Sequence, residues 1–256
     1  MGMYLNPGNS GFTGIRNDIY VDKSGLIRLI NDTIETPRRL TCVSRPRRFG
    51  KSFAAKMLCA YYDKTCDSSA LFKDLRIGSD AGMSESYREH LNQYDVIYLD
   101  MTTVLGNAAS QSIPAFIKSG VTKELLSAYP DLKEGNVFVE TLLSAVELTG
   151  NKFIMIIDEW DAPIRETPDN QKVYLEFLRT LFKGSGTTDR IFAAVYMTGI
   201  LPIKKDGSQS AISDFKEFTV VKPRRFGGYV GFTEEEVEGL CKEYRRDFAM
   251  MKQWYD

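Results

Sequence analysis

Short apolar segments alternate with longer amphipathic segments along this chain. Five segments rich in β-branched and aromatic residues have the length of buried strands: Leu40–Ser44, Val96–Asp100, Phe153–Asp158, Ile191–Thr198 and Phe218–Val221. Longer stretches between them repeat apolar residues at helical spacing: Ser52–Asp63, Gln111–Tyr129, Val137–Leu148 and Gln171–Gly184. This alternation predicts an α/β fold with a mostly parallel five-stranded sheet flanked by helices.

The C-terminal part of the sequence predicts one more helix, within GFTEEEVEGLCKEY. Thr233 is suited to cap its first turn, and Glu236 to complete a capping box. Between the fourth and fifth predicted strands, IKKDGSQSAISDF is a polar loop, placed where such sheets bind ligands. We therefore expect a core with an N-terminal extension in residues 1–205. Residues 206–256 would hold the last strand and the start of a C-terminal helical region.

Composition narrows the chemistry that the chain can perform. Its single histidine, His90, removes the usual general base and histidine-rich metal sites, so carboxylates and lysines must carry any catalysis. The four cysteines form no CxxC pair, which predicts neither disulfides nor a thiolate zinc site.

A formal net charge of −1 gives no long-range attraction for nucleic acid. No apolar run reaches the roughly 20 residues of a membrane span, and no secretory signal is recognisable, so we expect a cytoplasmic protein.

A phosphate-binding loop is predicted where the first strand meets the first helix, in the segment SRPRRFGKS. Such a loop turns backbone N–H groups and the positive end of a helix dipole toward an anion. Gly50 permits the close approach, Lys51 places a positive charge against the β and γ phosphates, and Ser52 offers a hydroxyl ligand to magnesium. The predicted nucleotide-binding residues are Arg47, Arg48, Phe49, Gly50, Lys51 and Ser52.

Arg45 stands where the usual motif begins with glycine. Either its backbone angle suits a side chain, or the loop is remodelled so that Arg47 or Arg48 reaches the phosphates. An ordinary basic turn that contains Gly-Lys-Ser by chance is the alternative for this segment alone.

The third predicted strand ends in two carboxylates, Asp158 and Glu159. Beside a phosphate loop, Asp158 would bind magnesium or its water shell, while Glu159 would polarise the attacking water. Thr198 ends the fourth strand and is a candidate sensor of the γ phosphate, the alternative being a threonine without ligand contact. The predicted catalytic residues are therefore Lys51, Glu159 and Thr198, and the predicted metal ligands are Ser52 and Asp158.

Other charged residues allow more than one role. Asp161 could cap a helix or hold a water on magnesium. Arg48, Arg165 or Arg190 could neutralise charge in a transition state, although exposed arginines are usually only solvated.

Together these segments resemble a family of bacterial AAA-ATPase-like proteins, often found N-terminal to a PD-(D/E)XK nuclease-like domain. The likeness spans most of the chain and rests on FTGIRNDIYVDKSGLI, RPRRFGKS, FIMIIDEWDAP, MTGILPI and GFTEEEV. It implies a P-loop NTPase fold of the additional-strand, AAA-like class, with Lys51, Ser52, Asp158 and Glu159 in the nucleotide roles. It also implies that the missing glycine at Arg45 is a trait of the family. The segment around Tyr20–Lys23 would pack ahead of the first strand and could lie near the base. Because such chains usually continue into the nuclease-like domain, we expect a truncated or shortened member.

The leading hypothesis is a Mg²⁺-dependent ATPase that binds ATP, hydrolyses it slowly, and regulates or drives a C-terminal effector. Adenine is favoured because Asn151-Lys152 does not continue into the Asn-Lys-x-Asp element that reads guanine. The alternative is a module that senses nucleotide without hydrolysis or contacts protein or nucleic acid, the latter through Arg38–Arg48 and Lys222–Arg225. A nuclease-like domain and further copies of the chain are the macromolecular partners that these hypotheses allow.

Overall fold

The computed structural model describes residues 2–79, 84–108, 111–183, 186–203 and 212–255, whose strands form one sheet. The strands are β1 (Leu40–Ser44), β2 (Asp95–Asp100), β3 (Phe153–Asp158), β4 (Phe192–Gly199) and β5 (Lys216–Phe218). Their order is β2-β3-β4-β1-β5, and every neighbouring pair is parallel. The predicted α/β fold is confirmed. Because β4 lies between β1 and β3 and all three run parallel, their carboxyl ends lie side by side along one side of the sheet, here called its carboxyl edge.

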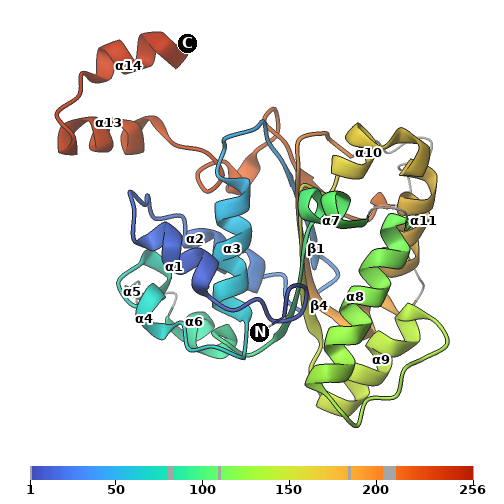
Figure 1. The fold of residues 1–256 in the computed structure, drawn as a ribbon. Coiled ribbons are helices and arrows are strands. Elements are labelled where there is room, and N and C mark those ends of the chain that lie inside the picture. Colours follow the sequence, from blue (N-terminus) through green and yellow to red (C-terminus); the bar gives the residue numbers. More distant parts are fainter. Residues whose placement is uncertain (1, 80–83, 109–110, 184–185, 204–211, 256) are drawn as a thin grey trace.

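Helices cover both faces of the sheet (Figure 1). One face carries α1 (Ser10–Arg16), α2 (Gly25–Asn31), α3 (Lys51–Tyr62), α4 (Ser69–Phe72), α5 (Arg76–Ser79) and α6 (Ser84–His90). The other carries α7 (Met101–Ala108), α8 (Ile113–Ala128), α9 (Phe138–Thr149), α10 (Ala162–Glu166) and α11 (Gln171–Phe182), with the 3-10 helix η1 (Pro168–Asn170) beside α10. Alternate residues of β3 enter the two cores, Ile154 and Ile156 on the α3 side and Met155 and Ile157 on the α8 side.

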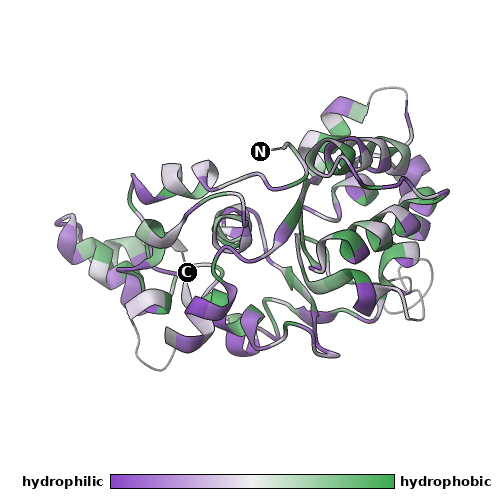
Figure 2. Ribbon diagram, turned by 90° about the horizontal axis from the view of Figure 1, so that it is seen from below, coloured by the Kyte–Doolittle hydropathy of each residue, from purple (hydrophilic) through white to green (hydrophobic). Residues whose placement is uncertain are grey.

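The four predicted crossover helices correspond to α3, α8, α9 and α11. Each begins and ends within two residues of the prediction, and Gly184, the last residue predicted for α11, lies outside the described residues. Helical ribbons in Figure 2 carry both hydrophilic and hydrophobic residues, as is expected of helices with one buried face. A short helix, α12 (Thr188–Ile191), leads into β4.

The fifth strand is displaced from its predicted position. The prediction was Phe218–Val221, whereas β5 is Lys216–Phe218 and its pairing with β1 ends at Phe218. Val220 and Val221 are 53% and 86% exposed, so these β-branched residues lie beyond the sheet. The prediction extended the strand too far because it relied on β propensity, which does not indicate where pairing with a neighbouring strand ends.

The C-terminal segment contains η3 (Arg224–Phe226), α13 (Glu234–Glu243) and α14 (Phe248–Tyr255), and the last two project away from the helical layers in Figure 1. The capping box predicted for Thr233 and Glu236 is present in both directions. The boundary placed after residue 205 and most of the polar loop before β5 fall in residues 204–211, outside the described chain. Among the described helices, none is long and apolar enough to cross a membrane.

Asp95, at the amino end of β2, anchors the N-terminal extension to the sheet. Its fully buried carboxylate accepts hydrogen bonds from Asn6 Nδ2 and the Tyr129 hydroxyl, each at 2.7 Å, and pairs with Lys64 Nζ at 2.7 Å. Asp95→Ala should lower the free energy of unfolding by about 3 kcal/mol in urea denaturation, because a half-buried ammonium loses its counterion. As a control, the exposed Asp74→Ala should change stability little. Equal losses in the two variants would contradict this anchoring role.

Candidate functional site

The predicted phosphate loop connects β1 to α3 at the carboxyl edge of the sheet. Gly50 is the N-cap of α3 and has φ of 74°, in the left-handed region that favours glycine. A Cβ at this position would meet no atom within 4 Å, so backbone conformation rather than space selects glycine. Arg48 shares the left-handed region, with φ of 69°. Residues 46–50 are all exposed, which leaves the loop open to a ligand from solvent.

Arg45 does not need the conformational freedom of a glycine, since it has no positive φ. Its backbone N–H donates to the carbonyl of Gly199 at 3.0 Å, which extends the pairing of β1 with β4. The side chain is 4% exposed, and its Nη1 has no hydrogen-bond partner among the described residues. Burial lowers the pKa of Arg45. Of the two alternatives left by the sequence, the first fits: the loop begins with a backbone that accepts a side chain.

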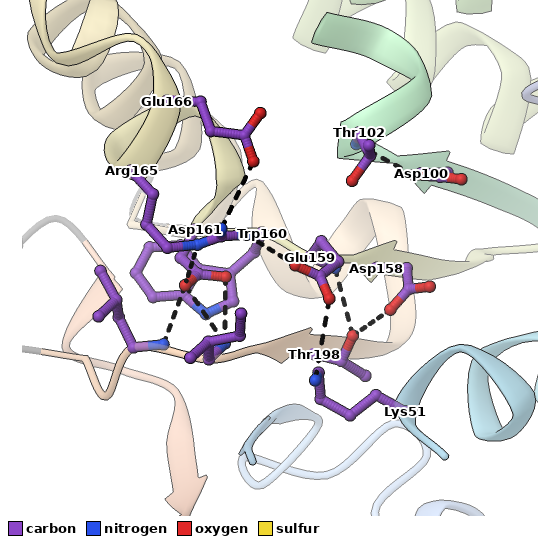
Figure 3. A network of polar contacts seen from close by, with 12 residues as sticks. Lys51, Asp100, Thr102, Asp158, Glu159, Trp160, Asp161, Arg165, Glu166 and Thr198 are labelled. Carbon is purple, nitrogen blue, oxygen red and sulfur yellow. Dashed lines mark hydrogen bonds and ion pairs between the residues drawn. The ribbon is translucent and has the colours of Figure 1, made fainter. Parts of the chain in front are cut away.

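Lys51 points from the first turn of α3 toward the end of β3 (Figure 3). The side chain is 4% exposed; its amine donates to the carbonyl of Pro46 at 2.9 Å and lies 3.8 Å from Glu159 Oε1. Burial lowers the pKa of Lys51, and the nearby carboxylates of Glu159, Asp158 and Asp161 partly oppose that shift. The structure therefore brings the predicted lysine to the two predicted carboxylates.

Thr198 connects Asp158 to Glu159. Its buried hydroxyl donates to Asp158 Oδ1 and accepts from the backbone N–H of Glu159 at 3.3 Å. Asp158 is itself 2% exposed. Asp158 and Thr198 meet because β3 and β4 pair in parallel, with Ile157 opposite Met197 one position before them.

Glu159 lies between two cations (Figure 3). Its Oε1 faces Lys51, and its Oε2 accepts a hydrogen bond from Arg165 Nη2 at 2.7 Å. The residue has φ of 55°, a left-handed backbone that is uncommon for a side chain of this size. The turn directly after β3 thus aims the carboxylate at the phosphate loop.

Asp161 is fully buried, and its carboxylate accepts from the backbone N–H groups of Ile200 and Leu201 and from Arg165 Nε. It does not cap α10, since its side chain makes no capping hydrogen bond there. The helix-capping interpretation of Asp161 is therefore wrong. Its role is to join the segment after β4 to Arg165. The contacts with Ile200 and Leu201 could not be predicted from the sequence, because these residues lie 39 and 40 positions away in the segment after β4.

Several predicted residues make few contacts. In the described part of the chain, Ser52 is half-buried without a side-chain hydrogen bond, and the exposed Arg47 and Arg48 make no ion pair. Arg190, on α12, directly precedes β4. It therefore lies at the amino ends of the strands, at the opposite edge of the sheet from Lys51, and is paired with Glu147. The described residues contain no group of three or more histidine, cysteine or carboxylate side chains able to hold a metal. Hydroxyl and carboxylate oxygens from Ser52 and Asp158 remain the candidate ligands.

An apolar cavity adjoins the phosphate loop. Three segments distant in sequence line it, with five aromatic side chains among them: Tyr20, Phe49, Phe53, Tyr229 and Phe232. Lys23 also lines the cavity, donates to the carbonyl of Gly228 at 2.9 Å, and forms an ion pair with Glu236 at the start of α13. Phe49 was predicted to bind nucleotide, and the family resemblance implied that the segment around Tyr20 lies near the base, whereas Tyr229 and Phe232 were not predicted to lie here.

A comparison with protein families shows to which family the chain belongs. The profile of the family described as "Predicted AAA-ATPase" matches residues 8–208, most of the chain. The chain belongs to this family. A comparison with curated proteins gives no match. As a predicted AAA-ATPase, the protein is implied to bind nucleotide, and the matched region contains the phosphate loop, both carboxylates and Thr198. The region ends before β5 and before the cavity residues Tyr229 and Phe232.

Proposed function

We propose that this AAA-ATPase family member binds ATP with Mg²⁺ and hydrolyses it slowly. The observation that carries the proposal is the convergence of Lys51 on Asp158 and Glu159, with 3.8 Å between the lysine amine and the Glu159 carboxylate. Such a cation and a carboxylate pair, at the carboxyl edge of a parallel sheet, are the groups that phosphoryl transfer requires. The free cysteines, at 42, 59, 66 and 241, are consistent with a reducing cytoplasm.

The phosphates would lie over the start of α3. The amine of Lys51 would exchange its bond to the Pro46 carbonyl for phosphate oxygens, and the backbone near Gly50 would supply N–H donors. The exposed Arg47 and Arg48 are free to add positive charge. Neutralisation of the phosphates by these groups is the first contribution of the protein.

The metal ligands proposed are the Ser52 hydroxyl and the Asp158 carboxylate. This oxygen set fits Mg²⁺, which keeps several waters and takes one or two carboxylates together with substrate phosphates. When bound, the ion would supply further positive charge to the β and γ phosphates. Thr198 holds Asp158 through its hydroxyl, so it would keep that carboxylate in place and respond to the γ phosphate.

Glu159 is proposed to polarise the water that attacks the γ phosphorus. The water oxygen forms the new bond, the bond to the β–γ bridging oxygen breaks, and the proton of the water passes to the carboxylate. The position of Glu159 beside Lys51 supports this role.

The apolar cavity is proposed to hold the adenine ring. Its aromatic residues offer faces for stacking, and none of its lining residues is an aspartate or glutamate, which guanine would use as an acceptor for its ring N–H. The cavity also adjoins α13 through the pair of Lys23 with Glu236, which supports a route from nucleotide to a C-terminal effector.

Binding of labelled nucleotides tests the proposed function. Titration of fluorescent ATP and GTP analogues into the chain with Mg²⁺ should give tighter binding for ATP, and phosphate release should stop when EDTA removes the metal. Binding without any phosphate release would favour the alternative nucleotide-sensing module. Absence of binding to both analogues would refute the proposal.

Phe232→Ala should weaken ATP binding about tenfold, because stacking of a base on an aromatic ring contributes about 1–3 kcal/mol. The side chain is 63% exposed, so its removal should leave the fold intact. Competition by inorganic triphosphate, which has no base, should be unchanged. Tyr244→Ala is the matched control, an exposed aromatic outside the cavity. Equal weakening of ATP and triphosphate would place Phe232 away from the base.

Nucleic-acid binding receives less support from the basic segments. The Arg39 guanidinium donates to the backbone carbonyls of Thr36, Asp189 and Phe192, and Arg225 lies 3.7 Å from Asp32. These cations have structural partners within the chain.

A further inference from the structure

Arg165, on α10, contacts three carboxylates at once (Figure 3). Its Nη2 donates to Glu159 at 2.7 Å, its Nε to Asp161 at 3.0 Å, and its Nη1 lies 3.4 Å from Glu166. The side chain is 17% exposed. A planar guanidinium held at two of its nitrogens has little freedom to rotate.

The contact with Asp161 anchors this arginine. Asp161 is fully buried, and Arg165 is its ion-pair partner in the described part of the chain. Movement of Arg165 toward a phosphate would leave that carboxylate buried without a counterion, which is strongly unfavourable. Arg165 is therefore poorly suited to act as a mobile arginine finger.

The same contact fixes the frame around Glu159. Asp161 also holds the backbone N–H groups of Ile200 and Leu201, and the carbonyl of Leu201 accepts from the Ser44 hydroxyl at the end of β1. The carboxyl ends of β1 and β4 and the turn after β3 are thus joined through one buried carboxylate. Arg165 extends this frame to Glu159.

Glu159 depends on such a partner. Its side chain has several rotatable bonds and is 21% exposed, and its second cation, Lys51, is 3.8 Å away. In the proposed reaction Lys51 turns to the phosphates, which leaves Arg165 to hold the carboxylate. A displacement of about 1 Å from the reacting geometry can cost about a hundredfold in rate.

We propose that Arg165 is a positioning residue, which orients Glu159 toward the attacking water and ties that orientation, through Asp161, to the segment after β4. This inference rests on the proposed ATPase function and adds a residue to it. Arg165 acts through Glu159 and makes no contact with the nucleotide.

The test compares steady-state ATP hydrolysis by the full chain and its Arg165→Gln variant. We expect kcat to fall about 10- to 100-fold while KM for ATP changes less than twofold. Arg165→Lys, which retains the charge, should recover part of kcat. In a Glu159→Gln background, Arg165→Gln should produce no further loss, since the group it orients is already disabled. Arg190→Gln, at the opposite edge of the sheet, is the matched control and should match the parent.

Each other outcome has a defined meaning. An unchanged or raised kcat, a KM that rises with the loss of kcat, or a further loss in the Glu159→Gln background would overturn the positioning role. If Arg165→Gln fails to fold in a thermal melt, the Lys variant decides alone, and full activity or raised KM there overturns the proposal. A parent chain that neither binds nor hydrolyses ATP would instead refute the ATPase function itself.

Discussion

Lys51→Ala is expected to abolish the stabilisation of this chain by Mg-ATP. For the parent, ATP at a hundred times its dissociation constant should add about 2.7 kcal/mol of stability, which corresponds to a rise in Tm of about 5–10 °C for a chain of this size. The variant should show no rise, because it lacks the buried amine that faces the carboxylates at the carboxyl edge. Differential scanning fluorimetry with and without nucleotide measures both values.

The variant without ligand should remain folded. Glu159 keeps its 2.7 Å hydrogen bond from Arg165 when the Lys51 amine is removed, so the loss of this amine should not prevent folding. Lys56→Ala is the matched control, since Lys56 is an exposed lysine on the same helix. Retention of the ATP-dependent rise by Lys51→Ala, or its loss in Lys56→Ala, would show that the nucleotide binds elsewhere.

Local signals in the sequence were enough to predict the parallel sheet, apart from the displaced β5, and the strand-turn-helix arrangement around Gly50. The apolar run Phe153–Asp158 became β3 without a change of boundary, since a strand buried on both faces needs continuous apolar residues. Gly50-Lys51-Ser52 follows one strand and begins one helix, so its neighbours along the chain determine its geometry. The convergence of Lys51 with Asp158 also followed from sequence, because parallel strands bring their carboxyl ends to one edge.

The contacts that the sequence did not predict are long-range side-chain contacts. Asp161 has the local pattern of a helix N-cap, yet its carboxylate turns to Ile200 and Leu201 on another loop. Phe232 gave no signal either, because the cavity forms only when α13 is packed beside the N-terminal segment. Hydrophobic periodicity describes which face of an element is buried and contains no information on which distant side chain it meets.

Glu159→Gln is expected to leave ATP binding intact and to lower kcat about 10²- to 10⁴-fold, the usual contribution of a positioned general base. The amide has nearly the same shape, and its oxygen still accepts from Arg165, so the frame at the end of β3 is preserved. It cannot accept a proton from water. Phosphate release measures kcat, and titration of a fluorescent ATP analogue measures binding in the same preparation.

Glu166→Gln is the matched control for this prediction. Glu166 is a neighbouring carboxylate on the same arginine, 3.4 Å from Arg165 Nη1, and its side chain is 47% exposed. It has no contact with Lys51 in the described structure, so its neutralisation should leave kcat near that of the parent. If Glu166→Gln lost as much turnover as Glu159→Gln, the loss of turnover would come from removing a carboxylate partner of Arg165 and not from removing a general base. If Glu159→Gln lost ATP affinity together with turnover, the carboxylate would be holding the nucleotide, and another group would have to activate the water.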